Sequence, residues 1–588
     1  MQDLFIPNGS EVKNGRVNFK LFLPDVSPIR IMAKAWPFNS NSDRVEIVLK
    51  NNEINMWTGS FEPKASGLYE YAYDVEYNDG SEYISSDPCA KLSSPRGEFS
   101  AFCVGESVKE GYAWQNDLRF NRPEDRELRV YELMLQDFTA EWQKTGLSPI
   151  SLATEMLDHI ANSGFNAIEF MPWIACPGSG YNWGYNPFHY FAVDPRLGTV
   201  GELKALIDRC HELGIVVIMD IALNHVDKVW GYLALYGSDK KLSPFIGDFH
   251  ETFLGMPDLD YENFYTQRLA FEVCKWWLDE FHIDGFRFDF TAGFYSDKND
   301  AGIKKLISDI YDYGREKFSS LPTLKTLPYM WLEYIGSKPT LEVLNDTAAS
   351  ACWYDDFRYS MHNMAQFKLL DGSIQQKLDP KCAGLQEESH GVKKTVISQL
   401  ENHDHHFFSI KLRCMENEKD QYGYPVGDRS IILWSKPFII ALYTGCGIPM
   451  IRNGQEFAEN WFLPESGWGR LLPRPIRWEY AEDQTGKLLS AFYAKMNKIR
   501  AKYLSLSTLN YYHYFTDTEK QIVAYHRFND NEKIVVVINF SFRGNLADVP
   551  FPQNGKWVDV LSGMKIEVSN WQKQVSVPSM DGYIFVLQ

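Results

Sequence analysis

Cysteine is scarce in this 588-residue chain, which holds nine scattered cysteines and no CxxC pair. Such a pattern argues against a disulfide framework and against a cysteine zinc site, so reduced, buried thiols are expected. No apolar run approaches the ~18 residues that a membrane helix needs, and no basic segment followed by an apolar one opens the chain. The expected location is therefore cytoplasmic, unless a signal segment has been removed.

Positive charge is also in short supply, because 59 Lys and Arg face 77 Asp and Glu, which gives a net charge of −18. Nucleic acid and anionic membranes repel such a chain, so neither is expected as a partner. The 45% hydrophobic and 23% charged fractions are those of an ordinary globular protein. Aromatic residues are abundant at 15%, and their rings fill cores and also stack against sugar rings.

The patterning divides the chain into three predicted domains. Short alternating β segments fill residues 1–110 and predict an N-terminal β-sandwich, in which Asn78-Asp79-Gly80 forms a hairpin turn. Residues 111–506 alternate apolar strands with amphipathic helices, with a short insertion at about 226–258. Residues 507–588 return to alternating strands, which predicts a C-terminal antiparallel β domain.

Eight strand candidates lie in the central domain, at residues 128–134, 165–171, 215–219, 283–290, 329–332, 351–354, 395–400 and 448–451. Apolar strands that alternate with amphipathic helices indicate a parallel sheet buried on both faces. Eight such units predict a (β/α)8 barrel, the TIM barrel. A doubly wound sheet is the alternative, but no Gly-rich phosphate loop follows the first strand, and polar residues end many strands rather than one switch point.

Polar side chains collect where these strands end. In chain order they are Asp220, Asn224 and His225; Arg287 and Asp289; Glu333; and His403 and Asp404. Since the carboxyl ends of barrel strands converge on one pocket, three carboxylates, Asp289, Glu333 and Asp404, are expected to face one site. Two of them fit a glycosidase pair, in which a protonated acid donates to the leaving oxygen and a carboxylate attacks the sugar carbon.

Several short motifs resemble, in the same order, the signatures of the α-amylase superfamily of glycoside hydrolases, family 13. They are Asp220-Ile-Ala-Leu-Asn224-His225, Gly285-Phe-Arg287-Phe-Asp289, Trp-Leu-Glu333-Tyr and Asn402-His403-Asp404. Tyr181-Asn-Trp-Gly-Tyr185-Asn-Pro, and Gly447-Ile-Pro-Met-Ile with Gly454-Gln-Glu, resemble its second-strand and eighth-strand signatures. The resemblance covers about residues 128–505.

This resemblance implies a role for each matching residue. Asp289 would be the nucleophile, kept ionised by Arg287, and Glu333 the general acid and base, its pKa raised by Trp331 and Leu332. Asp404 would grip sugar hydroxyls and favour an oxocarbenium-like ring. His225 and His403 would hydrogen-bond the sugar, Tyr185 would stack beneath it, and Asp220 would orient Arg287 or the histidine. A retaining pair, with its carboxyl groups about 5–5.5 Å apart, is expected.

No metal or other cofactor is predicted. Asn224 matches a position that ligates calcium in many relatives, but the following loop offers no identifiable partner carboxylates. His405 and His406 extend the cluster after His403, yet strand alternation turns His406 away, so a single metal is not expected there.

The resemblance points to two kinds of reaction. The Tyr181 stretch, with an N-terminal sandwich that resembles the family-48 carbohydrate-binding module, is similar to pullulanases, isoamylases and branching enzymes. Met256-Pro-Asp-Leu-Asp260, Leu-Glu-Asn-His-Asp404 and Pro475-Ile-Arg-Trp478 are more similar to amylases and neopullulanases.

The resemblance therefore implies a retaining hydrolase of α-glucosidic bonds in starch- or glycogen-type glucans, with α-1,4 cleavage favoured and α-1,6 cleavage open. A branching transglycosylase and a catalytically inactive glucan-binding protein are the alternatives. The expected partner is an α-glucan polysaccharide or oligosaccharide, and the oligomeric state is left open.

Overall fold

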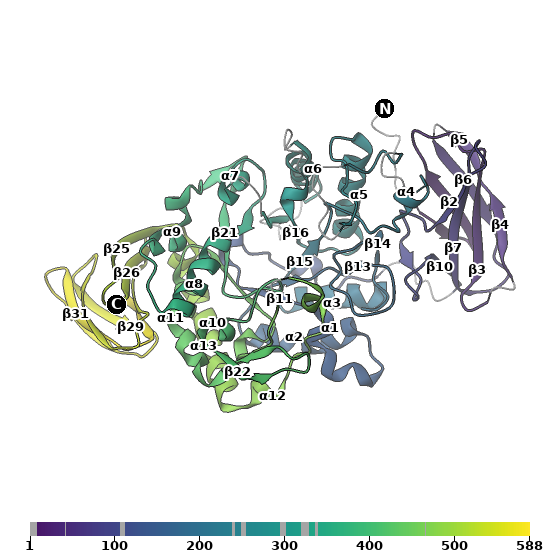
Figure 1. Ribbon diagram of the computed structural model, residues 1–588. Helices are drawn as coiled ribbons and strands as arrows, with labels where there is room; N and C mark the ends of the chain where they lie inside the picture. The colour runs from purple at the N-terminus through teal and green to yellow at the C-terminus, as the bar shows by residue number, and fades with distance from the viewer. Residues whose placement is uncertain are drawn as a thin grey trace.

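The computed structural model describes residues 9–40, 43–53, 55–105, 112–237, 242–247, 255–294, 301–318, 328–334, 339–464 and 466–588. An N-terminal pair of sheets, a central barrel and a C-terminal sheet lie in a row (Figure 1). Of the predicted insertion at 226–258, residues 238–241 and 248–254 lie outside the described ranges. Among the described helices, none combines the length and apolar character needed to cross a membrane.

All eight predicted barrel strands are confirmed. They are β11 (Val130–Leu133), β12 (Ala167–Phe170), β15 (Val216–Ile221), β16 (Gly285–Phe288), β17 (Tyr329–Leu332), β18 (Ala351–Trp353), β21 (Thr395–Gln399) and β24 (Ile448–Arg452). Neighbours pair in parallel and β24 pairs with β11, which closes the barrel and excludes the doubly wound alternative. Every residue of these strands is buried, which explains their continuous apolar sequence.

Amphipathic helices cover the barrel. The longer ones are α2 (Pro149–Asn162), α3 (Val200–Glu212), α5 (Phe264–Glu280), α6 (Ala301–Phe318), α8 (Asp355–Phe367), α11 (Lys436–Thr444) and α13 (Gln484–Lys502). Thr199 and Glu202 form a capping box at the start of α3, which explains why this helix begins there. α13 begins at Gln484, because the Asp483 side chain accepts from the Gly486 N–H at 2.7 Å and caps the helix.

The N-terminal part is a sandwich of two antiparallel sheets. One contains β2 (Arg16–Phe22) and β6 (Met56–Phe61), and the other contains β3 (Arg30–Pro37) and β7 (Gly67–Glu76). The predicted hairpin is confirmed, since β7 pairs with β8 (Glu82–Ser85) and Gly80 has a φ of +83°. Phe19 lies 5.3 Å from the ring of Tyr71 between the sheets.

The C-terminal part is antiparallel, as predicted. Its main sheet orders β25 (Tyr511–Asp517), β26 (Ile522–Phe528), β27 (Lys533–Asn539), β32 (Asp581–Leu587), β29 (Gly555–Asp559) and β30 (Lys565–Val568). β28 (Asn545–Pro550) pairs with β31 (Gln572–Val577). The buried Arg527 of β26 donates to the carbonyls of Thr444 and Gly445, at 2.5 and 2.6 Å, and so joins this sheet to the end of α11.

Candidate active site

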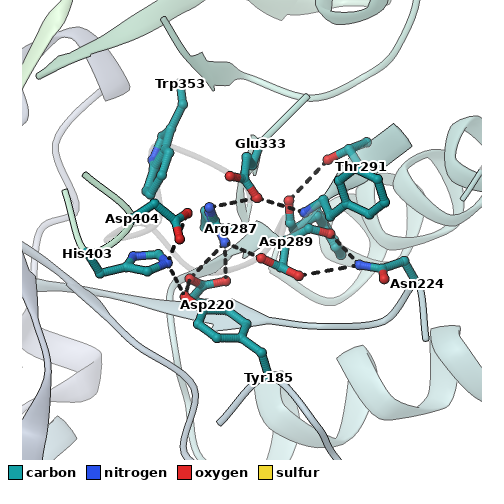
Figure 2. A network of polar contacts seen from close by, with 12 residues as sticks. Tyr185, Asp220, Asn224, Arg287, Asp289, Thr291, Glu333, Trp353, His403 and Asp404 are labelled. Carbon is teal, nitrogen blue, oxygen red and sulfur yellow. Dashed lines mark hydrogen bonds and ion pairs between the residues drawn. The ribbon is translucent and has the colours of Figure 1, made fainter. Parts of the chain in front are cut away.

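The candidate active site is assembled around Arg287 of β16, whose side chain is fully buried (Figure 2). Its Nη1 donates to both oxygens of Asp220 and to Asp289 Oδ1, each at 2.9 Å, and its Nη2 lies 2.9 Å from Glu333 Oε2. The guanidinium carbon lies 4.0 Å from the ring centre of Trp353 on β18. One planar cation therefore gathers three carboxylates that come from neighbouring strands.

Local sequence explains this convergence. On β16, Phe286 and Phe288 belong to the large apolar cluster that the helices help to form, so alternation turns Arg287 to the other face of the strand. Gly285 permits close pairing with β17, because a Cβ there would lie 2.2 Å from the Tyr329 carbonyl oxygen. The ladder continues past the strand, where the N–H of Glu333 donates to the Phe288 carbonyl at 3.1 Å. Asp289 and Glu333 thus follow adjacent strands.

Asp289 is held by its backbone and its charge. Asn224 donates to the Asp289 carbonyl oxygen at 2.8 Å. Burial raises the pKa of Asp289 to about 6; Arg287 opposes this rise, while Asp220 and Asp404 add to it. The sequence had suggested that Arg287 keeps Asp289 ionised. Arg287 does not hold the pKa of Asp289 at its ordinary value, but with a pKa of about 6 Asp289 is still mainly ionised at pH 7.

Glu333 has a stronger preference for its proton. Burial raises its pKa to about 8, and repulsion from Asp289 and Asp404 contributes to the rise, which Arg287 opposes. The N–H of Phe290 donates to Glu333 Oε2 at 2.8 Å and fixes the carboxyl group. Asp289 and Glu333 share one guanidinium, and the retaining separation expected between them stays a prediction.

Asp404 lies between two cations. His403 Nε2 is 3.4 Å from one of its oxygens, and Arg470 donates to the other. Burial raises the pKa of Asp404, but His403 and Arg470 together bring it below its ordinary value. Burial opposes the charging of His403, yet Asp404 and Glu132 raise its pKa to about 9. At neutral pH the pair is a carboxylate beside an imidazolium.

Tyr185 and the two predicted histidines form one connected group. The Tyr185 hydroxyl donates to Asp220 at 2.7 Å, lies 2.9 Å from His403 Nε2, and its ring stacks on His403 with centres 5.3 Å apart. His225 Nε2 lies 2.6 Å from the Tyr185 carbonyl oxygen, and its Nδ1 contacts Asn224 Oδ1. A sugar contact from His225 would therefore have to replace one of these protein partners.

Three residues of the site were not singled out from the sequence. Glu132 of β11 lies 2.7 Å from His403 Nδ1, Trp353 lies against Arg287, and Arg470 pairs with Asp404. Glu132 carries the same signal as Arg287, a charge inside an apolar strand, and could have been found by it. Arg470 lies in a short 3-10 helix, Trp468–Leu471, whose sequence carries no sign of its partner.

Metal ligation was considered at Asn224 and at His405 and His406, and the expectation of no required metal stays a prediction. In the described part of the chain, no group of three or more His, Cys, Asp or Glu side chains is arranged to hold a metal ion. The Asn224 side chain is directed at Asp289 and His225. The ring centre of His406 lies 4.6 Å from that of Phe462, and burial lowers the pKa of His405. Neither histidine is assigned a role.

The protein is a closed (β/α)8 barrel, and at the carboxyl end of its strands a cluster of carboxylates surrounds a buried arginine. An acidic site of this kind is suited to the hydrolysis or transfer of glycosides. The model of the family described as alpha amylase, catalytic domain, matches residues 150–243, and that of the alpha amylase C-terminal all-beta domain matches residues 512–588. The resemblance to the α-amylase superfamily is confirmed. Neither match covers the N-terminal sandwich, whose resemblance to a family-48 module stays a prediction.

Individual relatives are distant. A 1,4-alpha-glucan branching enzyme from Corynebacterium jeikeium is 22% identical over 603 residues, which cover 95% of this chain and 78% of that enzyme. The branching enzyme of Halothermothrix orenii is 24% identical over 55% of this chain, and the match spans only about half (51%) of its own length.

A crystal structure of pullulanase complexed with maltotriose, from Anoxybacillus sp. LM18-11, has a TM-score of 0.74 and 18% identity and covers 100% of this chain and 87% of that one. At this identity the likeness shows a shared fold.

Proposed function

We propose that the protein is a retaining glycoside hydrolase that cleaves α-glucosidic bonds in starch- or glycogen-type glucans, with α-1,4 bonds favoured and α-1,6 bonds left open as substrates. The observation that carries the proposal is that Asp289 and Glu333 both lie 2.9 Å from the guanidinium of Arg287. Burial raises the pKa of Glu333 to about 8 and that of Asp289 to about 6, which favours a protonated Glu333 beside an ionised Asp289 near pH 7. A nucleophile and a general acid have these states. Metal ions and other cofactors are not part of the proposal.

In the first step the Asp289 carboxylate attacks the anomeric carbon while the bond from that carbon to the glycosidic oxygen breaks. Glu333 gives its proton to the departing oxygen and becomes a carboxylate. In the second step that carboxylate takes a proton from water, whose oxygen attacks the anomeric carbon and releases Asp289. Asp404, ionised beside His403, stabilises the positive charge that develops on the sugar ring.

A branching transglycosylase is the second candidate, and the distant likeness to two branching enzymes favours it. Both reactions share the glycosyl-enzyme; they differ in whether water or a sugar hydroxyl intercepts it. An inactive glucan-binding protein is less well supported, because Asp289, Glu333 and Asp404 are all present. The cytoplasmic location stays a prediction.

Incubation with amylose, pullulan and glycogen separates these possibilities. Hydrolysis produces new reducing ends, and the linkage preference follows from the relative rates on amylose and pullulan. New branches without new reducing ends would assign a transglycosylase. Asp289→Asn should abolish turnover on every active substrate, and full activity of this variant would contradict the proposed nucleophile.

A further inference from the structure

A cavity of about 650 Å³ opens beside α2 and α13, and its lining contains no residue of the candidate active site. Its walls come from the 3-10 helix Ala140–Thr145, from α2, from α12 (Glu479–Glu482) and from the start of α13. Figure 1 shows α2, α12 and α13 on one side of the barrel. The volume lies within the range of pockets that hold small molecules.

Two tryptophans form an aromatic corner in this cavity. Trp142 and Trp478 are half-buried, with ring centres 5.3 Å apart and planes inclined by 57°. Trp478 is fixed, because its indole N–H donates to the Phe138 carbonyl at 3.1 Å and its ring packs 5.2 Å from His159. Among the described residues, no acceptor is found for the indole N–H of Trp142. The fixed ring of Trp478 thus lies next to the ring of Trp142, whose indole N–H is available to a ligand.

The polar part of the lining offers both donors and acceptors. Glu141 and Glu479 are exposed, and Glu482 forms an ion pair of 3.0 Å with Lys487. His159 Nε2 lies 3.0 Å from Glu456 Oε1, so Nδ1 is the ring nitrogen not engaged by that carboxylate. Hydroxyl groups both donate and accept hydrogen bonds, so a ligand rich in hydroxyls matches this mixture.

We propose that this cavity is a second glucan-binding site, in which Trp142 and Trp478 stack against glucose rings of a chain that also reaches the barrel site. The inference rests on the proposed function, because it takes the same class of ligand. Two aromatic rings near carboxylates also suit a quaternary ammonium ion. The two rings contact each other, with centres 5.3 Å apart, and leave no space between them to enclose a cation, which favours the uncharged sugar. A second contact on the same chain raises the effective affinity for long glucans without new contacts at the barrel site.

The test compares glycogen binding with the turnover of a short substrate. Trp142→Ala should weaken retardation in native gels that contain glycogen by about tenfold, as the loss of one aromatic contact predicts, while kcat and KM for maltotetraose stay unchanged. Trp142→Phe should restore part of the binding. Trp571→Ala, which removes a 58% exposed tryptophan outside the cavity, is the matched control and should bind like the parent.

A second variant tests the same proposal in case Trp142→Ala fails to fold. Ala481→Arg leaves both tryptophans in place and fills the cavity, and it should weaken glycogen binding to the same extent. Parental retardation of both folded variants would overturn the proposal. Isothermal titration calorimetry gives a second test. The proposal would also be overturned if tetramethylammonium gave binding heats that Trp142→Ala removes, while maltotriose gave none. If Trp142→Ala lowers glycogen binding while the parent turns over no glucan, the proposed function fails and this binding site stands. If the parent turns over glucans but Trp142→Ala binds glycogen like the parent, only this binding site is rejected.

Discussion

Arg287 cannot keep every carboxylate around it ionised. Its guanidinium contacts Asp220, Asp289 and Glu333, and it is itself buried together with Asp220 and Glu333. Burial favours the neutral form of each acid, so charge is shared unequally and Glu333 holds its proton more firmly than Asp289. Unequal pKa values within one pair of carboxyl groups are what acid and nucleophile roles require.

The first prediction concerns pH. The pKa of Asp289, about 6, lies above its ordinary value, so the proposed nucleophile is neutral and inactive at lower pH. The pKa of Glu333, about 8, is also raised, so the proposed general acid loses its proton at higher pH. A profile of kcat/KM on maltotetraose should therefore rise through about pH 6 and fall through about pH 8. An optimum below pH 5 would contradict the assignment.

Glu333→Gln should lower the turnover of natural glucans by about 10²- to 10⁴-fold, because the leaving oxygen then receives no proton. A glucosyl fluoride needs no such proton, so the variant should still form a glycosyl-enzyme that mass spectrometry locates on Asp289. Attachment at any other residue would refute the assigned nucleophile.

Glu401→Gln is the matched control for this variant. Burial raises the pKa of Glu401 to about 8 as well, but its carboxyl group accepts from the Phe408 N–H and, within the described part of the chain, does not contact Arg287. Turnover by this variant should stay within severalfold of the parent. Equal losses in the two variants would mean that removal of any buried acid damages the barrel, and that Glu333 has no special role.

At the scale of elements, the barrel could be predicted because burial on both faces imposes continuous apolar strands, such as Val216–Ile221. The residues at the strand ends could be predicted to lie close together, because the carboxyl ends of parallel strands lie at the same end of the barrel. Arg470 could not, because its approach to Asp404 depends on the path of an irregular segment. Arg474 holds that segment by donating to the carbonyls of Gly469, Arg470 and Leu472, a tertiary arrangement without any local sequence pattern.

The close pairing of β16 and β17 depends on Gly285. A Cβ at this position would lie 2.2 Å from the Tyr329 carbonyl oxygen, so Gly285→Ala should separate the strands that carry Asp289 and Glu333. We expect lower thermal stability and loss of turnover. Gly201→Ala is the control: it lies in the first turn of α3 with no heavy atom within 4 Å of the added Cβ, and should not lower thermal stability. Thermal unfolding of both variants provides the measurement.

At the scale of the whole molecule, the three parts share one apolar core. A single cluster of buried residues extends from Val17 in the sandwich, through the barrel strands, to Ile584 in the C-terminal sheet. Hydrogen bonds also join the sandwich to the segment around α4 (Gly231–Ala234): Tyr236 donates to the Pro24 carbonyl at 2.5 Å, and Tyr77 donates to the Leu235 carbonyl at 2.8 Å. The sandwich is therefore expected to unfold together with the barrel.

The last prediction tests this docking at Gly231. A Cβ there would lie 2.5 Å from the Ser86 carbonyl oxygen of the sandwich, so Gly231→Ala should push α4 away from it. Because the added methyl group meets backbone, which cannot rotate aside, the contact should open rather than adjust. Limited proteolysis should then release an N-terminal fragment that ends near the predicted boundary at residue 110, whereas the parent and Gly201→Ala resist cleavage. A proteolytic pattern identical to that of the parent would show that α4 is not what holds the sandwich against the barrel.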